Sequence, residues 1–306
     1  MALYVQTNTS SINSQRMLAR STNKLNGSYE KLASGLRINS AKDDAAGLQI
    51  SNRMTSEING LTQGNRNAND GISMCQVTEG ALDEVTTMLQ RIRTLAIESA
   101  NGTNSDEERK ALNQEVQQLI EEVYRIGTDT TFGGNLNVLA ASGTTANGIA
   151  DRTDGIDFQV GSNALQTVNL KMKSLSTLVT VSGAITIADR NGTAQTMASN
   201  GDTLSAVTVS TASAAQQTIA KVSHFIQRVD AYRAEMGAVQ NRLESTISNQ
   251  ENIIENVNDA RARIRDVDYA SETAAMTQQN IIQQASTTIL TQANQKTQIA
   301  LNLLQG

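Results

Sequence analysis

Residues 219–264 read IAKVSHFIQRVDAYRAEMGAVQNRLESTISNQENIIENVNDARARI. Positions spaced seven apart in this stretch form a row that is apolar except at Gln250: Val222, Val229, Met236, Leu243, Val257 and Ile264. Such a strict repeat is typical of a helix that supercoils against partners, because a period of 3.5 residues keeps the apolar stripe facing one way. At about 1.5 Å per residue this helix would span roughly 69 Å, and we expect the rest of the chain to pack on it or project from it.

The N-terminal part of the chain shows similar spacing. Apolar residues three and four apart predict a helix from Leu18 to Leu36, and the pattern is lost between Gly35 and Gly47. A second long helix is expected from about residue 50 to residue 100, entered near Asp43 or Asp44, either of which could cap it. Its sevenfold seam consists of Leu61, Ala68, Cys75, Leu82, Leu89 and Ala96.

Two shorter signals complete the helical part. Ser105 and Glu108 have the spacing of a capping box, which predicts the start of a third helix that Gly127 is expected to close. The short link before Ser105 indicates an antiparallel hairpin with the second helix. A last helix is expected over residues 267–304, after a break near Arg265 and Asp266.

Between residues 128 and 215 the periodicity changes. Alternation of apolar and polar residues, punctuated by glycines, predicts short strands at 158–160, 168–172, 178–181 and 185–187. The expected fold class is therefore mainly α: a long antiparallel, coiled-coil-like helical bundle formed by the N- and C-terminal segments, with a small central β-containing insertion.

Composition and charge exclude several function classes. The 306 residues include no proline, which permits long uninterrupted helices, and their net charge of −5 disfavours a nucleic-acid partner. No apolar run reaches the roughly 18 residues of a membrane span, so we expect no membrane insertion. One cysteine and one histidine supply no metal-ligand set. The carboxylate pairs Asp43–Asp44 and Glu121–Glu122 lack a second catalytic group, so we expect neither an enzyme nor a cofactor.

Two single residues could have either a structural or a chemical role. Cys75 falls within an unbroken apolar seam, so we expect a buried structural thiol rather than a reactive one. His224 lies outside both stripes of the 219–264 helix, so we expect a solvated surface residue.

Both ends of the chain carry only thin apolar stripes. The free energy gained by burying such thin stripes is small compared with the entropy cost of ordering the helices. We therefore expect the ends to order on assembly with further copies. The residues assigned to this assembly are Leu18, Leu25, Leu32 and Leu36 at one end and Ile282, Ile289, Ile299, Leu303 and Leu304 at the other. The bundle seam is assigned to Leu61, Leu82, Leu89, Val229, Met236, Leu243, Val257 and Ile264.

Several blocks of sequence are also similar to a known family. Residues 32–47, LASGLRINSAKDDAAG, resemble the signature of bacterial flagellins. The further matching blocks are 60–63, 66–73, 78–82, 237–243, 268–270, 283–285 and 292–295. The resemblance covers about residues 1–140 and 215–306, and it leaves a short centre that fits a family with a variable central domain.

The resemblance implies a subunit that polymerises into the hollow flagellar filament. Residues 1–40 and 266–306 would be the terminal helices that line the filament core, 41–140 and 215–265 the helical outer tube, and 141–214 a variable domain at the surface. It also implies an extracellular location, reached without a cleaved signal peptide by unfolded passage through a type III export channel. The implied partners are further copies, flagellar cap and hook-associated proteins, and an export chaperone at the C-terminal segment.

The resemblance further implies recognition by a flagellin-sensing Toll-like receptor. The matching positions are Arg91, Leu95 and Glu115, of which the first two are four residues apart on one helix. The alternative to a filament subunit is a hook–filament junction protein, which shares the terminal helices, or another coiled-coil rod module. The signature blocks favour the filament subunit.

Overall fold

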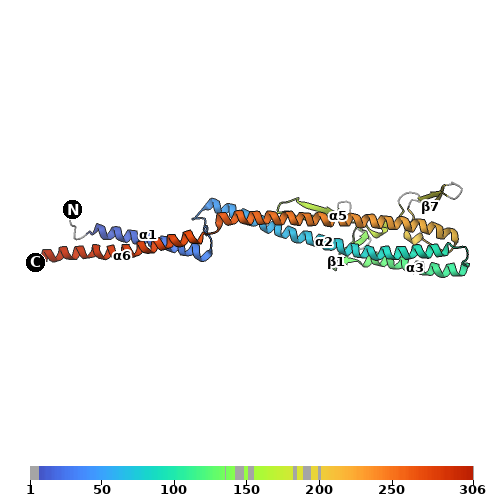
Figure 1. The fold of residues 1–306 in the computed structure, drawn as a ribbon, viewed down its shortest axis with the longest axis horizontal. Coiled ribbons are helices and arrows are strands. Elements are labelled where there is room, and N and C mark those ends of the chain that lie inside the picture. The colour runs from blue at the N-terminus through green and yellow to red at the C-terminus, as the bar shows by residue number, and fades with distance from the viewer. Residues whose placement is uncertain are drawn as a thin grey trace. The chain divides into compact units, whose positions relative to one another are not determined.

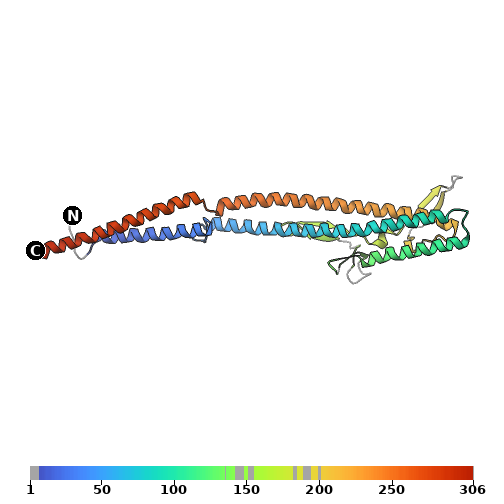
Figure 2. The ribbon, with the colours of Figure 1, turned by 60° about the horizontal axis from the view of Figure 1, so that its bottom comes forward.

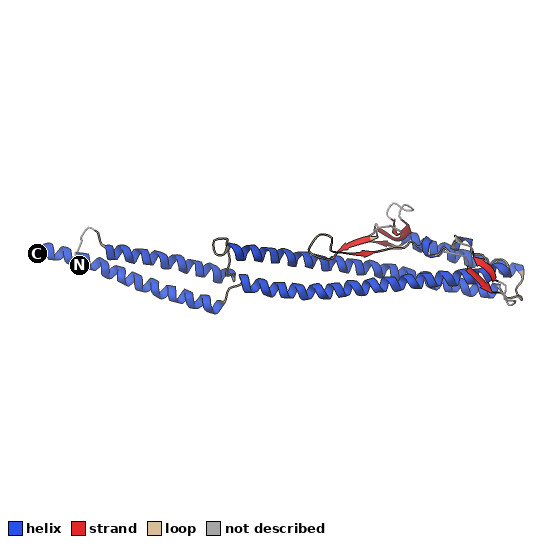
Figure 3. Ribbon diagram, turned by 90° about the horizontal axis from the view of Figure 1, so that it is seen from above, coloured by secondary structure: helices blue, strands red, loops and turns tan. Residues whose placement is uncertain are grey.

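The computed structural model describes residues 7–134, 136–141, 148–150, 155–181, 185–188, 194–198 and 201–305. Its long helices are α1 (Thr9–Ser34), α2 (Ala45–Ser99), α3 (Asp106–Asp129), α5 (Ala212–Arg265) and α6 (Tyr269–Gln305). They form two compact units, which we call the terminal unit (residues 1–58 and 253–306) and the inner unit (residues 59–252). The mainly α class with a small β-containing centre is thereby confirmed, and Figure 3 shows how little of the ribbon is strand.

The core of the inner unit lies between α2, α3 and α5, which run side by side in Figures 1 and 2. Polar contacts show that α2 and α5 are antiparallel: Arg233 pairs with Asp83 at 3.0 Å, and Arg93 Nε donates to Ser223 Oγ at 3.2 Å. The seam residues of this unit are all buried: Leu61, Leu82, Leu89, Val229, Met236 and Leu243. Val257 and Ile264 belong to the terminal unit and are half-buried.

The turn between α2 and α3 is held by Arg109, which is buried. Its guanidinium donates to the carbonyls of Ser99, Asn101 and Asn104 and so satisfies acceptors that the end of α2 leaves free. The predicted capping box is confirmed, because Glu108 N donates to Ser105 Oγ at 3.3 Å and Ser105 N donates to Glu108 Oε2 at 2.6 Å. These bonds fix the hairpin that the short link indicated.

The end of α3 differs from the prediction, because Gly127 lies buried inside the last turn and does not close the helix. A Cβ at Gly127 would lie 2.8 Å from Leu175 Cδ2, so this position takes glycine to let the short helix α4 (Leu175–Leu178) pack closely. The helix ends at Asp129, and both the backbone N–H and the hydroxyl of Thr130 donate to the Ile126 carbonyl.

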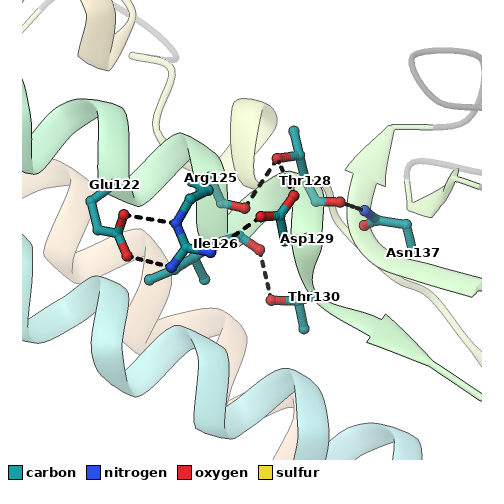
Figure 4. Close-up of polar contacts among 7 residues, drawn as sticks. All are labelled: Glu122, Arg125, Ile126, Thr128, Asp129, Thr130 and Asn137. Atoms are coloured by element: carbon teal, nitrogen blue, oxygen red, sulfur yellow. Dashed lines mark hydrogen bonds and ion pairs between the residues drawn. The ribbon is translucent and has the colours of Figure 1, made fainter. Parts of the chain in front are cut away.

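Figure 4 shows the polar residues that lead the chain from α3 into the first sheet. Arg125 pairs with Glu122 at 2.5 Å and with Asp129 at 3.1 Å, and these two carboxylates raise its pKa. The buried Asn137 donates to the Thr128 carbonyl and accepts from two backbone N–H groups of its own strand. This bonding satisfies the backbone where the helix gives way to the sheet.

The strands form three small sheets in the inner unit. A three-stranded sheet joins β1 (Thr131–Phe132), β2 (Leu136–Ala141) and β3 (Gly148–Ala150), and two antiparallel hairpins pair β4 (Ile156–Gln159) with β5 (Thr167–Leu170) and β6 (Ile185–Ala188) with β7 (Ala194–Ala198). Three of the four predicted strands are confirmed as β4, β5 and β6. The strand predicted over residues 178–181 is wrong.

The first residue of the segment predicted as that fourth strand, Leu178, is the last residue of α4. Ser174 caps α4 by accepting from Thr177 N at 3.1 Å, and a short 3-10 turn (Leu204–Ala206) follows later in the chain. The segment does not show the alternation of buried and exposed side chains that a strand with one solvated face requires. Its apolar residues, Leu178, Val179 and Val181, are all buried, as is Leu175. Only Thr180 makes a β-bridge, to Thr203. Burial on every side, rather than on one face, gave the apolar run its strand-like appearance.

Two glycines of α2 make room for the β4–β5 hairpin. A Cβ at Gly64 would lie 1.8 Å from the Val160 carbonyl oxygen, and one at Gly60 would lie 2.8 Å from Ser162 Cβ. The hairpin therefore lies directly against the helix backbone. Gln250 of α5 donates to the same Val160 carbonyl at 2.7 Å, which explains the polar interruption of the heptad row.

We predict opposite effects for two glycine-to-alanine substitutions within α2. Gly64→Ala should lower the free energy of unfolding by about 1–3 kcal/mol, because the new methyl displaces the hairpin backbone. Gly80→Ala should raise it by up to about 1 kcal/mol, because a Cβ there meets nothing within 4 Å and alanine favours the helix. Urea unfolding followed by circular dichroism measures both, and equal effects of the two variants would contradict the docking of the hairpin.

Candidate assembly interface

The terminal unit is built on the pairing of α1 with α6, which lie side by side and antiparallel in Figures 1 and 2. Asn8 Nδ2 donates to the Ala293 carbonyl at 2.8 Å, and Ser21 Oγ donates to the Gln279 carbonyl at 2.9 Å. Asn8 also caps α1, because its side chain accepts from Ser11 N. Polar side chains thus make specific contacts along the length of the pair.

The residues buried in this pairing are mostly small. On α1 they are Ser11, Ser14, Ser21, Leu25 and Ser28, and on α6 they include Ser286 and Ala293. Leu25 is the one large apolar side chain of α1 that is buried. A serine-lined contact of this kind removes little apolar area from water, so the hydrophobic effect contributes little to the pairing.

Several large apolar residues of the same two helices point outward. Ile281 is 61% exposed, Ile12 56% and Ile289 54%. Met17, Tyr29, Tyr269 and Ile282 are exposed as well. This arrangement is the reverse of an ordinary helix pair, which buries its large side chains and exposes its small polar ones. The terminal unit therefore has exposed apolar surface on both helices.

Part of this surface is a shallow groove on the first half of α6. It is lined by Tyr269, Thr273, Thr277 and Ile281, each four residues after the last, with Ala270, Ala274, Gln278 and Ile282 beside them. Residues four apart share one face of a helix, so the groove follows a single α6 face. Its chemistry suits apolar side chains from another helix.

The structure places the predicted assembly residues in three different environments. Leu25 is buried, Leu18, Leu32 and Leu36 are half-buried, and Ile282 and Ile289 are exposed. The side chains of Ile299, Leu303 and Leu304 lie outside the described residues. Sequence reasoning missed Ile12, Met17, Tyr269 and Ile281, because they lie off the apolar rows. The signal that could have found them is the sevenfold row of Ser14, Ser21 and Ser28, which marks the buried face.

A well-bonded turn links α1 to α2 inside the terminal unit. Gly35 ends α1 in the left-handed conformation with φ 72°, and its carbonyl accepts from Val267 N at 3.0 Å. Arg37 N donates to the Arg265 carbonyl at 2.7 Å, so the turn and the α5–α6 link form a short antiparallel bridge. The predicted break near Arg265 is thus confirmed, and hydrogen bonds hold it in place.

Asp43 and Asp44 have separate roles in this turn. Asp44 Oδ1 accepts from Gly47 N at 2.9 Å at the start of α2, so of the two predicted caps it is Asp44 that caps the helix. Asp43 Oδ2 accepts from the backbone N–H groups of Ser40 at 3.0 Å and Asn39 at 3.1 Å. These bonds, led by the one from Ser40, lower the pKa of the Asp43 carboxyl.

The residues expected to meet a receptor do not share one exposed face. Arg91 and Glu115 are exposed and form an ion pair of 2.6 Å between α2 and α3. Leu95 is only 1% exposed and belongs to the core of the inner unit. Arg91 therefore faces solvent, whereas Leu95, about one helical turn later, faces the core.

The two single residues have different outcomes. Cys75 is buried as expected, and burial, with a smaller contribution from Glu79, raises the pKa of its thiol to about 11. His224 is half-buried, and its Nδ1 is buried without a hydrogen-bond partner, so the solvated position expected for it is wrong. Desolvation, with the nearby Arg228, lowers the pKa of its imidazole.

Two properties of the described residues concern metal binding and membrane crossing. Among the described residues, no group of three or more His, Cys, Asp or Glu side chains could hold a metal ion. In the same part of the chain, no helix has the length and apolar character needed to cross a membrane.

Comparison with known proteins gives two family matches. The bacterial flagellin N-terminal helical region matches residues 5–144, and the bacterial flagellin C-terminal helical region matches residues 219–304. Polar flagellin F of Vibrio parahaemolyticus is 39% identical over 376 aligned positions, which cover 99% of this chain and 100% of that protein. B-type flagellin of Pseudomonas aeruginosa is 52% identical over 176 residues, 58% of this chain and 34% of that protein.

The extent of these matches differs between relatives. The chain spans only 34% of the Pseudomonas protein and 47% of polar flagellin C of Vibrio parahaemolyticus. Among solved structures, a putative flagellar hook-associated protein from Vibrio parahaemolyticus is similar with a TM-score of 0.58 and 13% identity, over 73% of this chain and 100% of that one. A likeness at this identity shows the fold alone.

We predict that the turn at Asp43 is stable at neutral pH and loosens in acid. A folded-state pKa below the ordinary value means that the stabilisation is present above about pH 4 and is lost as the pH falls through the lowered pKa. Hydrogen exchange should show protection of the Asn39 and Ser40 amides at neutral pH that declines in acid. Asp43→Asn should remove that pH dependence, and a wild-type protection that is constant down to about pH 2 would contradict the assignment.

Proposed function

This chain belongs to the bacterial flagellin family, and from that premise we propose that it polymerises with copies of itself into the hollow helical filament that bacteria use for swimming. The family is one of structural proteins. The observation that carries the proposal is the reversed burial of the terminal unit, where serines are packed inside and isoleucines face solvent. In a filament, the apolar surface of α1 and α6 would be covered by neighbouring subunits.

The energetics favour assembly as the role of that surface. Contiguous apolar surface on a single protein molecule marks an interaction site, because it is costly to keep in water. Fully burying a side chain such as Ile281 or Ile289 contributes about 1.5–3 kcal/mol. The α1–α6 pair has several of these side chains on its outside, so contacts between copies supply the apolar burial that the serine-lined pairing lacks.

The runner-up is a subunit of the hook–filament junction. Its support is the likeness to the hook-associated structure, which is limited to the fold because only 13% of the residues are identical. Flagellins, in contrast, match by sequence at 39% over the whole chain and at 52% over part of it. The sequence relatives therefore favour the filament subunit.

The arrangement within the filament follows from the same proposal. We assign residues 1–40 and 266–306 to the core lining, 41–140 and 215–265 to the outer tube, and 141–214 to the exposed surface. The flagellar cap and hook-associated proteins would contact the ends of the polymer. Before assembly, we propose that the chain passes unfolded through a type III export channel without a cleaved signal peptide, and that a chaperone covers its C-terminal segment until then.

We predict that polar substitutions on the outer face of α6 block assembly and spare the fold. The double variant Ile281→Gln, Ile289→Gln should melt as the wild type does, because both side chains are exposed and glutamine suits a helix. Monomer mixed with sheared filament fragments should elongate them when it is wild type and fail to do so when it is this variant, as seen by negative-stain electron microscopy. Gln284→Ala, which trims an exposed polar side chain of the same helix, is the control.

Two results would count against the filament proposal. Wild-type monomer that binds fragment ends without elongating them would favour the junction protein. Equal elongation by the double variant and the wild type would show that the exposed isoleucines are not the assembly surface.

We also propose that Arg91 and Glu115 are the surface through which a flagellin-sensing Toll-like receptor recognises the monomer. Arg91→Ala and Glu115→Ala should each weaken receptor signalling in reporter cells, while the loss of an exposed ion pair changes stability by less than about 1 kcal/mol. Arg125→Ala, which removes an exposed ion-paired arginine elsewhere on α3, should leave signalling intact. Undiminished signalling by both Arg91→Ala and Glu115→Ala would refute this partner surface.

A further inference from the structure

Leu165, in the turn between β4 and β5, combines two unfavourable features. Its side chain is 93% exposed, the largest value among the exposed large hydrophobic residues of the described chain. Its φ is 66°, and it is the one non-glycine residue with positive φ among the residues that the structure describes. A bulky side chain in the left-handed region is strained, and an exposed leucine loses the free energy that burial would give.

The surrounding turn is rigid and holds Leu165 in this conformation. Val160 N and Gly161 N both donate to the Gln166 carbonyl, at 3.0 and 3.1 Å. Gln159 Nε2 donates to the Gly161 carbonyl at 2.8 Å and to the Asn163 carbonyl at 2.6 Å. Hydrogen bonds on both sides therefore fix the backbone, and strain that is over-determined in this way is typical of binding sites.

The hairpin itself is anchored to the long helices. The Val160 carbonyl lies against Gly64 and accepts from Gln250, and the buried Val160 and Val168 pack with Ala68 and Leu243. The turn is thus a fixed projection of the inner unit that presents one leucine. Such preorganisation lowers the entropy lost when a partner covers the side chain.

The charge around the turn indicates what kind of partner covers it. The chain has a net charge of −5, so two copies repel each other wherever their acidic surfaces meet. Residues 160–168, VGSNALQTV, carry no charged side chain. The turn therefore adds no charge of its own to a contact between two copies.

From these observations we propose that Leu165 inserts into the surface of a second copy of this chain and strengthens a lateral contact in the polymer. The inference rests on the proposed function, since it requires that copies assemble. It goes beyond it by assigning a contact residue in the inner unit, apart from the exposed apolar faces of α1 and α6.

Leu165→Asn tests the inference, because asparagine tolerates positive φ and has no apolar surface to bury. The variant monomer should melt at or above the wild-type temperature, since the substitution relieves strain. The concentration of monomer left in equilibrium with seeded filaments should rise about tenfold or more, as expected for the loss of a buried leucine at each contact. Ala164→Asn places the same amide at the neighbouring exposed position and should leave that concentration close to the wild-type value.

A labelling experiment gives an independent readout. With Cys75→Ala as background, Leu165→Cys should react quickly with a maleimide in the monomer and slowly in the filament. The contact would be overturned if Leu165→Asn left the same monomer concentration as the wild type, or if Leu165→Cys were labelled at equal rates in monomer and filament. Either result would leave the filament proposal intact. Failure of the wild type to elongate seeds would instead overturn the proposed function and this inference together.

Discussion

The inner unit depends on the apolar seam between α2 and α5. Each helix repeats its apolar residues every seven positions, and the two rows are buried against each other along the antiparallel pair. Intrinsic helix preference cannot hold α2 alone, because Gly60, Gly64, Gly71 and Gly80 each disfavour a free helix by about 1 kcal/mol relative to alanine. Two of these glycines, Gly60 and Gly64, leave space for the hairpin that lies against the helix.

The terminal unit follows a different physical rule. Its helix pair is held by hydrogen bonds from Asn8 and Ser21 and by close approach at small residues, with Leu25 the large apolar residue that α1 buries. The hydrophobic free energy available to α1 and α6 is therefore left mostly unused within one copy. In the proposed polymer, contacts between copies would supply the apolar burial that one copy lacks.

Helix positions and fold class could be predicted because they depend on local periodicity and caps. The heptads of α5, the capping box at Ser105 and the break at Gly35 are each visible within a few residues. What failed depended on contacts distant in the chain. Gly127 was misread as a helix end because the glycine is needed there for close packing against Leu175. Residues 178–181 were misread because a short apolar run that is buried on all sides resembles a strand in sequence.

The exposed apolar residues of the terminal unit were predicted only in part for a similar reason. Apolar rows identify what a helix would bury if it followed the usual rule, so they pointed to Leu25 and Leu32 rather than to Ile12 and Ile281. On the inner unit, Arg91 lies in solvent, whereas Leu95 is buried by packing partners from other helices, which the spacing of the two residues does not reveal. A residue's exposure is a property of its neighbours, and these come from elsewhere in the chain.

The position of Cys75 has a practical consequence for observing this molecule. Its thiol is fully buried, and a pKa of about 11 keeps it protonated at neutral pH, so a thiol reagent meets no nucleophile while the core is closed. Opening of the α2–α5 seam exposes the sulfur and returns it to ordinary reactivity. The rate at which a thiol reagent labels the unmodified chain therefore reports how often the core opens, and no engineered cysteine is needed.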